Sequence, residues 1–405
     1  MISRDRYIKK IRPLINKPVI KVLTGIRRAG KSAMLSLIED ELTGRGIDTQ
    51  HIIRINFEES RYFPLTDAAA LDTYISSLIT GKKTYYLLID EIQEVQSWEK
   101  VINSLFASGV CDIYITGSNS RLLSSELSTY LTGRYVEIPV QTLSFAETLD
   151  FAEARTGKRP DAKNAFISYL KNGGFPMLHT GDYDADTIKM IANGIYSSAI
   201  LRDVVQRHNL RNSVLLERLV MFLFDNTGNI FSARSVSDFL KSENLSISPN
   251  TIYEYLSMLE EAFVVHRVQR FDMAGKRILK TLEKYYVSDT SLITSTLGFR
   301  DTKVAGLLEN IVFLELLSRD YKVYVGKSGS KEIDFVAEKS GERIYIQVAR
   351  IIGSDETQER EFGPLLSIAD HYPKYVVTMD ELAGGNIDGV KHIHIADFLL
   401  MEDFS

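Results

Sequence analysis

The sequence predicts a protein of the α/β class, with an open parallel sheet in its N-terminal third. The first observation is a glycine-rich run, Gly25–Ser32, between an apolar strand pattern at 19–23 and a helical pattern at 31–42. The second is a hydrophobic run at 85–89 that two acidic residues follow. The third is another strand pattern at 112–116, followed by a turn-forming Gly-Ser-Asn. Strands that alternate with helices in this way favour a parallel sheet.

The run from Gly25 to Ser32 fits the pattern G-x-x-x-x-G-K-[ST] of a phosphate-binding loop. Its glycines let the backbone N–H groups turn inward towards phosphate oxygens, and the following helix adds the positive end of its dipole. Lys31 is expected to reach the β- and γ-phosphates of ATP, and the Ser32 hydroxyl to bind Mg²⁺. The residues expected around the nucleotide are Gly25, Ile26, Arg27, Arg28, Ala29, Gly30, Lys31 and Ser32. We expect Arg27 and Arg28 to face solvent or phosphate without a catalytic role.

The two acids at the end of the second strand match what a magnesium nucleotide requires. Asp90 is expected to hold Mg²⁺ through water, and Glu91 to polarise the water that attacks the γ-phosphate. The alternative is a pair of solvated acids at a strand end, which the loop upstream makes the weaker interpretation.

Two further polar positions are candidates for contact with the phosphates. Asn119 and Ser118 follow the strand at 112–116, which we expect to lie between the loop strand and the acid strand. A polar side chain there would touch the γ-phosphate or the attacking water, although Gly-Ser-Asn is also an ordinary turn. Arg134, before the next strand, either stabilises phosphate charge, in its own subunit or a neighbour's, or is a surface arginine.

The segments GIRRAGKS, LLIDEIQEVQSWE, ITGSNS, LTGRY and LSFAETL resemble those of prokaryotic ATPases of the AAA superfamily. NGGFP at 172–176 also fits this resemblance, which is strongest over residues 19–150. It implies ATP as ligand, a glutamate for hydrolysis at Glu91 and a γ-phosphate sensor at Asn119. It also implies a C-terminal domain of unknown function, and it names no biological role.

The rest of the chain divides into three further parts by pattern. A P-loop ATPase domain at 1–142 is expected to precede a helical lid at 143–207, a winged helix at 208–293 and a small α/β domain at 294–405. Helical patterns at 232–240 and 248–259, followed by two strand patterns, favour the winged helix.

Basic residues in the hairpin of this winged helix suggest contact with double-stranded DNA. They are Arg267, Arg270, Lys276, Arg277, Lys280 and Lys284, set against Asp272 and Glu283. Against this, Glu254, Glu260 and Glu261 lie on the expected recognition helix, where negative charge would face phosphate. Winged helices also bind proteins, so the partner is either DNA or a protein.

The last part resembles the restriction-endonuclease-like fold, in which acids and a lysine hold a divalent metal and activate water. Glu309 and Asp334 match the first two acids of such a site. Gln347 replaces the third acid and Ala349 stands where the lysine is expected, so the site is predicted to be vestigial and cleavage lost.

Composition is ordinary for a globular protein, with 405 residues, 44% hydrophobic residues, one cysteine and a net charge of −5. We expect no membrane span, no signal peptide and a cytoplasmic location. Three functions follow as hypotheses: an ATPase acting on DNA or a DNA–protein complex, a nucleotide-gated switch that binds a protein, and an ATP-coupled nuclease. The oligomeric state does not follow from the sequence.

Overall fold

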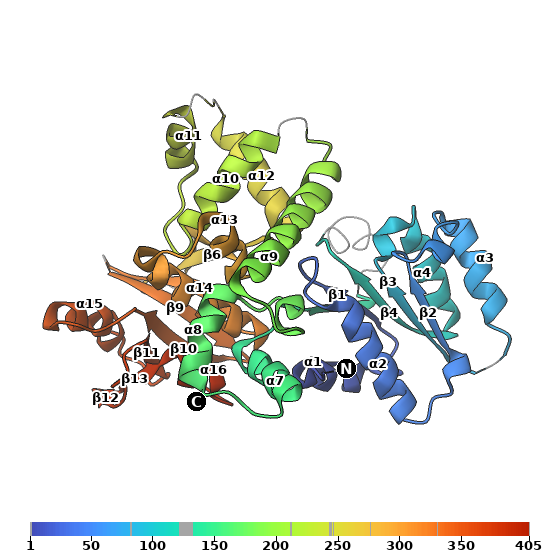
Figure 1. Ribbon diagram of the computed structural model, residues 1–405, viewed down its shortest axis with the longest axis horizontal. Coiled ribbons are helices and arrows are strands. Elements are labelled where there is room, and N and C mark those ends of the chain that lie inside the picture. Colours follow the sequence, from blue (N-terminus) through green and yellow to red (C-terminus); the bar gives the residue numbers. More distant parts are fainter. Residues whose placement is uncertain are drawn as a thin grey trace. The chain divides into compact units, whose positions relative to one another are not determined.

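The computed structural model describes residues 2–81, 83–120, 133–210, 213–242, 245, 247–275, 277–329 and 331–404. The chain forms two compact units (Figure 1). The first comprises Met1–Val140 with Glu261–Phe263, and the second comprises Gln141–Glu260 with Val264–Ser405. The change of unit at residue 140 falls close to the boundary at 142 that the sequence predicts.

The first unit is a five-stranded parallel sheet with the strand order β2-β3-β4-β1-β5. Its strands are β1 (Ile20–Thr24), β2 (Ile52–Asn56), β3 (Tyr85–Asp90), β4 (Cys111–Gly117) and β5 (Tyr135–Pro139). Its helices are α1 (Asp5–Ile11), α2 (Lys31–Gly44), α3 (Ala68–Leu78) and α4 (Trp98–Ser108), with short 3-10 turns η1 (Arg12–Leu14), η2 (Thr49–His51), η3 (Ser60–Tyr62) and η4 (Ile92–Glu94). The predicted α/β class and parallel sheet are confirmed.

The central strands of this sheet are buried, because helices cover both faces of a parallel sheet. Every residue of β1 and β3 is buried. As expected, β4 lies between β1 and β3. The loop strand, the strand with two polar residues after it and the acid strand are therefore neighbours, and their carboxyl ends meet at one edge.

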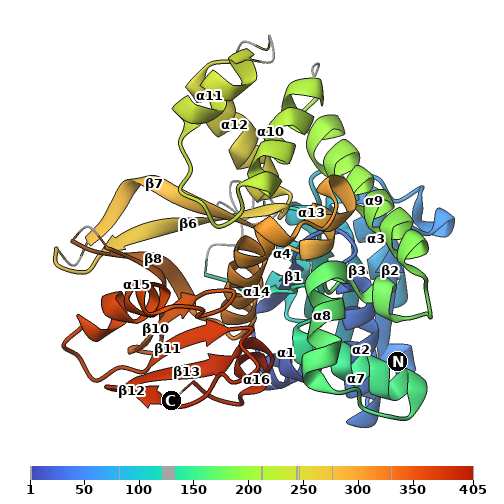
Figure 2. The ribbon, with the colours of Figure 1, turned by 60° about the vertical axis from the view of Figure 1, so that its left-hand side comes forward.

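The second unit combines helices with an eight-stranded sheet (Figure 2). Its helices are α7 (Phe145–Thr156), α8 (Ala162–Asn172), α9 (Ala185–Ile200), α10 (Ser213–Asp225), α11 (Ala233–Ser242), α12 (Pro249–Glu261), α13 (Thr290–Leu297), α14 (Val304–Ser318), α15 (Asp355–Leu366) and α16 (Ile395–Leu400). The shorter turns are η5 (Pro176–His179), η7 (Asp301–Lys303) and a π-helical turn, η6 (Leu201–Gln206), which continues α9.

The sheet of the second unit has the order β12-β13-β11-β10-β9-β8-β6-β7. Its strands are β6 (Val265–Asp272), β7 (Arg277–Val287), β8 (Lys322–Ser328), β9 (Lys331–Lys339), β10 (Glu342–Val348), β11 (Lys374–Thr378), β12 (Asn386–Ile387) and β13 (Val390–His394). β8, β9 and β10 are antiparallel neighbours, whereas β11 runs parallel to β10 and β13 parallel to β11.

The helices and hairpin predicted for a winged helix are present, but the hairpin is not a separate wing. β6 pairs with β7 and also, in parallel, with β8 through Arg270–Asp272 and Val325–Lys327 (Figure 2). The domain boundary expected near residue 293 therefore separates strands that belong to one sheet. Because β6 and β8 are far apart in sequence, local patterns could not reveal this pairing.

The helical segment predicted as a lid at 143–207 also packs within the second unit. The Gly174 N–H donates to the Asp289 carboxylate at 2.8 Å, and the Thr294 hydroxyl donates to the Lys171 carbonyl at 2.6 Å. These contacts join α8 and the turn after it to α13. The segment is thus packed on the C-terminal half of the chain and does not form a separate body.

No helix in the described ranges is long and apolar enough to cross a lipid bilayer.

Candidate functional site

The glycine-rich loop connects β1 to α2, and both of its glycines occupy positions that other residues would strain. Gly25 has φ 141°, and a Cβ there would lie 2.2 Å from the carbonyl oxygen of Val140. Gly30 has φ 98° and immediately precedes α2, whose start has no side-chain cap. The loop therefore has the tight turn, and the uncapped helix start, that an anion-binding loop requires.

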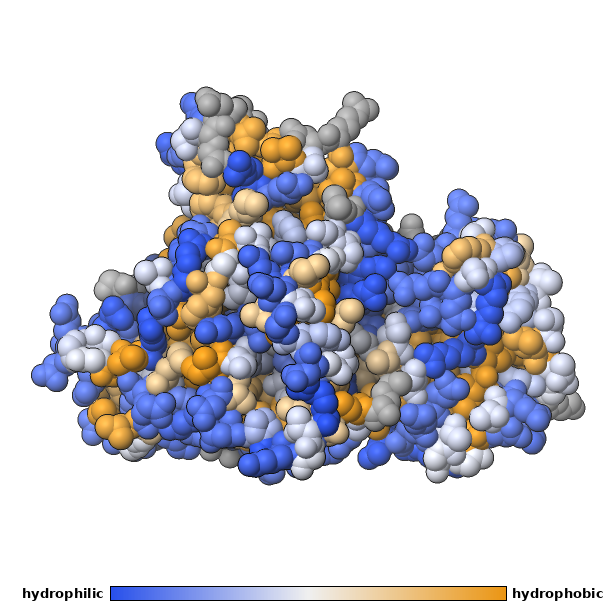
Figure 3. Space-filling model, viewed as in Figure 1, coloured by the Kyte–Doolittle hydropathy of each residue, from blue (hydrophilic) through white to orange (hydrophobic). Residues whose placement is uncertain are grey.

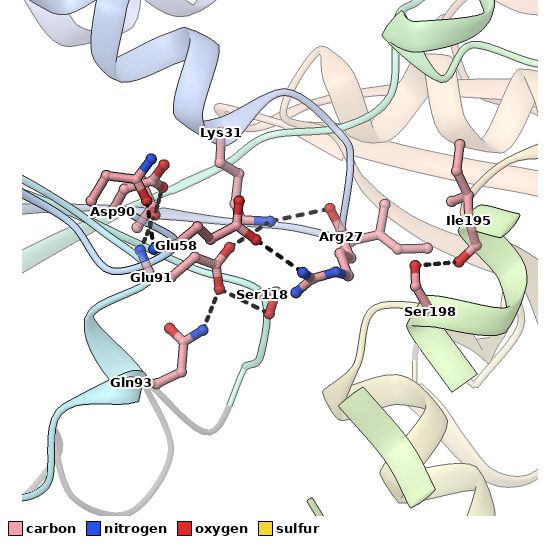
Figure 4. Close-up of polar contacts among 12 residues, drawn as sticks. Arg27, Lys31, Glu58, Asp90, Glu91, Gln93, Ser118, Ile195 and Ser198 are labelled. Carbon is pink, nitrogen blue, oxygen red and sulfur yellow. Dashed lines mark hydrogen bonds and ion pairs between the residues drawn. The ribbon is translucent and has the colours of Figure 1, made fainter. Parts of the chain in front are cut away.

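Lys31 is the first residue of α2 and its side chain is buried, with 3% exposed. Its ammonium group donates to the carbonyl oxygens of Gly25 and Ile26 at 2.9 and 3.2 Å (Figure 4). It also lies 4.0 Å from the Glu91 carboxylate. A buried ammonium group is therefore held in the curve of the loop, facing the acid strand.

Asp90, the last residue of β3, is fully buried. Its Oδ1 accepts a hydrogen bond from the Thr116 hydroxyl, and the Ser32 hydroxyl also interacts with the carboxylate. Burial raises the pKa of Asp90, and the two hydroxyls oppose this shift. Its Oδ2 is buried and accepts no hydrogen bond from the described residues.

A magnesium ion fits this arrangement of donors. Mg²⁺ prefers oxygen ligands and usually uses one or two protein groups together with phosphates and water. Ser32 and Asp90 supply those oxygens, and the unsatisfied Oδ2 of Asp90 gains a partner when a cation binds.

Glu91 follows β3 in the left-handed region, with φ 54°, which is uncommon for residues other than glycine. Its N–H donates to the Thr116 hydroxyl at 3.0 Å. Its Oε2 accepts hydrogen bonds from Gln93 and, at 3.3 Å, from the Ser118 hydroxyl (Figure 4). A positive φ at a residue other than glycine often marks a functional site, because the surrounding contacts must hold the strained backbone in place.

The remaining predicted residues of this edge lie in different surroundings. Asn119 follows Ser118 after β4, and both are buried. Arg27 is buried and forms an ion pair with Glu58 at 2.9 Å (Figure 4). This ion pair links Glu58, which follows β2, to the glycine-rich loop. Arg28 is exposed and has a φ of 69°.

Arg134 lies at the opposite end of the strands from the glycine-rich loop. It precedes β5, which runs parallel to β1 with Ile20 opposite Tyr135, so it lies at the amino ends of the strands. Its side chain donates to Asn103 at 2.6 Å and lines a cavity of about 580 Å³ with Cys111. Because the loop follows the carboxyl end of β1, the expectation that Arg134 contacts phosphate within its own subunit is wrong.

In the second unit, the arginines predicted to contact DNA are paired with acids. Arg267 lies 3.6 Å from Glu260, and Arg277 lies 3.7 Å from Asp272. Arg270 is buried and lies 4.0 Å from Glu332, so it is not a surface contact for DNA. Lys276 and the side chain of Lys280 lie outside the described residues. Folding has therefore neutralised much of the basic character that the sequence suggests.

The predicted vestigial nuclease residues do come together. The Asp334 N–H donates to the Gln347 side chain at 3.3 Å, and the Val348 N–H donates to Asp334 Oδ2 at 2.8 Å. Burial, followed by the nearby Glu309 carboxylate, raises the pKa of Asp334 to about 8.

Lys284, which the sequence suggests as part of the basic patch, is placed by β7 among these acids instead. Its ammonium group lies 2.8 Å from Glu309, 2.9 Å from Glu332 and 3.6 Å from Asp334, and its side chain is 3% exposed. Three nearby carboxylates raise its pKa against the opposing effect of burial. No group of three or more His, Cys, Asp or Glu side chains in the described part of the chain is arranged to hold a metal ion. The Lys284 ammonium group therefore supplies the positive charge that offsets the negative charge of these carboxylates.

We expect Lys284→Met to lower the free energy of unfolding by about 3–5 kcal/mol, because it leaves buried carboxylates without their cation. Urea unfolding of the two proteins measures the difference. Lys241→Met on α11, where the lysine is exposed, is the matched control and should change stability by less than about 0.5 kcal/mol. A loss below about 1 kcal/mol for Lys284→Met would contradict this account of the cluster.

Three features define a P-loop domain of the AAA superfamily: a phosphate loop after β1, two acids at the end of β3 and the strand order β2-β3-β4-β1-β5. Residues 17–149 match the family of AAA domains, and residues 163–303 match a domain of unknown function.

The chain belongs to the same family as an uncharacterized protein of Haemophilus influenzae, with 39% identity over 401 residues and 99% of each chain covered. Protein MJ1544 of Methanocaldococcus jannaschii is 34% identical over 346 residues, which cover 83% of this chain and 75% of that protein. Among solved structures, the Walker-type ATPase PABY2304 of Pyrococcus abyssi matches with a TM-score of 0.49 and 16% identity, covering 73% of this chain and 95% of that chain.

Proposed function

We propose that this protein binds ATP with Mg²⁺ at the loop between β1 and α2 and hydrolyses it. The observation that carries the proposal is the meeting of Lys31, Asp90 and Glu91 at one edge of the sheet, with one Asp90 oxygen that accepts no hydrogen bond from the described residues. A buried cation, a buried acid with a free oxygen and a second acid beside them are the groups that phosphoryl transfer to water requires.

Each side chain takes a role that its position allows. Lys31 neutralises charge on the γ-phosphate, and Glu91 accepts a proton from the attacking water. Ser32 and Asp90 would hold Mg²⁺, which would supply positive charge to offset the negative charge of the phosphates. Asn119 and Ser118, both buried after β4, are the candidates for sensing the γ-phosphate. Arg134 has a role in hydrolysis only if a neighbouring subunit presents it.

We further propose that turnover regulates how the second unit engages a partner, and that a protein is the better supported partner. The hairpin arginines proposed for double-stranded DNA are paired with acids. By contrast, hydrophobic residues are exposed on and beside α10, α11 and α12 (Figure 3). They include Val214, Met221, Ile230, Phe239 and Tyr253, which are 36–52% exposed. Exposed apolar groups of this kind favour protein contacts over phosphate contacts.

Steady-state ATP hydrolysis, with and without double-stranded DNA at two salt concentrations, tests both parts. We expect turnover that EDTA abolishes and that DNA does not change. Stimulation of ATP turnover by DNA that weakens at higher salt would instead identify DNA as the partner, since phosphate contacts weaken as salt rises. Absence of magnesium-dependent hydrolysis under every condition would reject the proposed activity.

We propose that the second unit does not cleave DNA. Gln347 and Ala349 replace the acid and the lysine of an active site, and Lys284 occupies the space between the remaining acids. Supercoiled plasmid incubated with the protein and Mg²⁺ or Mn²⁺ should stay intact. Nicking that requires metal and disappears in Asp334→Ala would overturn this prediction.

A further inference from the structure

Thr116 on β4 makes contacts with both acids of the candidate ATPase site. Its side chain is fully buried, and the register of β3 with β4, in which Ile89 faces Ile115, places it beside Asp90. The hydroxyl donates to Asp90 Oδ1 at 2.5 Å and accepts from the Glu91 N–H at 3.0 Å. One buried side chain therefore bridges two residues with different proposed roles.

These two hydrogen bonds fix the direction of each acid. A hydroxyl has a single proton, and here it points at Asp90, so Oδ1 is occupied and Oδ2 is the oxygen left for a cation. The second bond holds the backbone of Glu91 at its positive φ, which turns the chain after β3. That turn carries the Glu91 carboxylate to within 4.0 Å of the Lys31 ammonium group.

We propose that Thr116 is a positioning residue for ATP hydrolysis, which aligns Asp90 with the magnesium ion and Glu91 with the attacking water. This inference rests on the proposed ATPase function. Thr116 touches neither nucleotide nor water in this role and acts through the two acids. Gln93 and Ser118 donate to Glu91 Oε2, whereas the Thr116 hydroxyl accepts from the backbone N–H of Glu91.

A structural alternative is that Thr116 only fills space in a buried strand, where β-branched residues are favoured. Two variants separate these roles. Thr116→Val keeps the branched shape and removes the hydroxyl, which leaves Asp90 Oδ1 and the Glu91 N–H without this partner. Thr116→Ser keeps the hydroxyl and removes the methyl group. A packing role predicts that serine is the more harmful change, and a positioning role predicts the reverse.

The experiment measures kcat, KM for ATP and the Mg²⁺ concentration that gives half-maximal activity for the full-length protein and both variants. Thr116→Val should lower kcat by about 10- to 100-fold, the range of a lost orienting contact. It should also raise the Mg²⁺ requirement and leave KM within about threefold. Thr116→Ser should keep kcat within about threefold. Circular dichroism checks folding, and Thr116→Ala replaces the valine variant if that variant is unfolded.

A kcat for Thr116→Val close to the wild-type value would overturn the proposal, as would an equal loss in Thr116→Ser. Failure of the proposed ATPase function would appear separately, as absence of hydrolysis in the wild-type protein. In that event the test is the gain in ATP affinity on adding Mg²⁺, measured by calorimetry. Thr116 positions Asp90 only if this gain is smaller in Thr116→Val than in the wild type.

Discussion

Lys31→Ala should lower ATP affinity at least about tenfold and hydrolysis at least about a hundredfold. The Lys31 ammonium group is buried at the start of α2 and donates to two carbonyl groups of the loop, at 2.9 and 3.2 Å. Alanine removes the only charge of that side chain, and the loss of one preorganised contact with transition-state charge typically costs 10²–10³ in kcat. Titration with a fluorescent ATP analogue and a phosphate-release assay measure the two effects.

Lys100→Ala is a matched control, because it removes an exposed lysine from α4 of the same unit. Its ATP affinity and turnover should stay within about twofold of the wild-type values. Normal ATP binding by Lys31→Ala would show that the loop does not bind the nucleotide in the way we propose. A parallel loss in both variants would instead indicate general damage to the unit.

Local sequence patterns were sufficient to predict the structural core of the first unit. The apolar run of β1, the two glycines of the loop and the helical pattern of α2 are contiguous, so their arrangement follows from short-range rules. The position of β4 between β1 and β3 was also predicted and is confirmed. Gly25 shows why the pattern is strict, since any side chain there would collide with the Val140 carbonyl group.

What sequence reasoning missed depends on contacts between distant residues. Lys284 lies 25 residues before Glu309 in sequence, and the pattern of β7 gives no sign that its ammonium group meets the acids. The sequence does not show that the hairpin arginines pair with Glu260, Asp272 and Glu332, because each pair joins two different elements of the fold. The start of a strand after Arg134 is visible in the sequence, but the distance of Arg134 from the loop follows only from the parallel register of β1 and β5.

The roles of Asp90 and Glu91 show the same limit within the site. Two acids after a strand predict a magnesium site and a catalytic base, but they do not reveal what orients them. The Thr116 hydroxyl and the side chains of Gln93 and Ser118 do so in the structure. Threonine in a strand and glutamine after one are common, so no local signal could have marked them.

Glu91→Gln should abolish turnover and spare nucleotide binding, the second large effect that we expect. Glutamine has nearly the same shape, and its amide can still interact with Gln93 and Ser118. The Thr116 hydroxyl can still accept from the backbone N–H, so the bend at this position should persist. It cannot accept a proton from water, and loss of a general base typically costs 10²–10⁴ in rate. Glu94→Gln, an exposed position on η4, is the matched control and should keep turnover within about twofold.

The contrast between binding and turnover in Glu91→Gln gives the variant a second use. If it binds ATP normally and hydrolyses it at least about a hundredfold more slowly, it holds the protein in the ATP-bound state. A partner that engages this state should then be retained by Glu91→Gln and not by Lys31→Ala. Turnover by Glu91→Gln at the wild-type rate would show that another group activates the water, and the role of the acid strand would be limited to Asp90 and the metal.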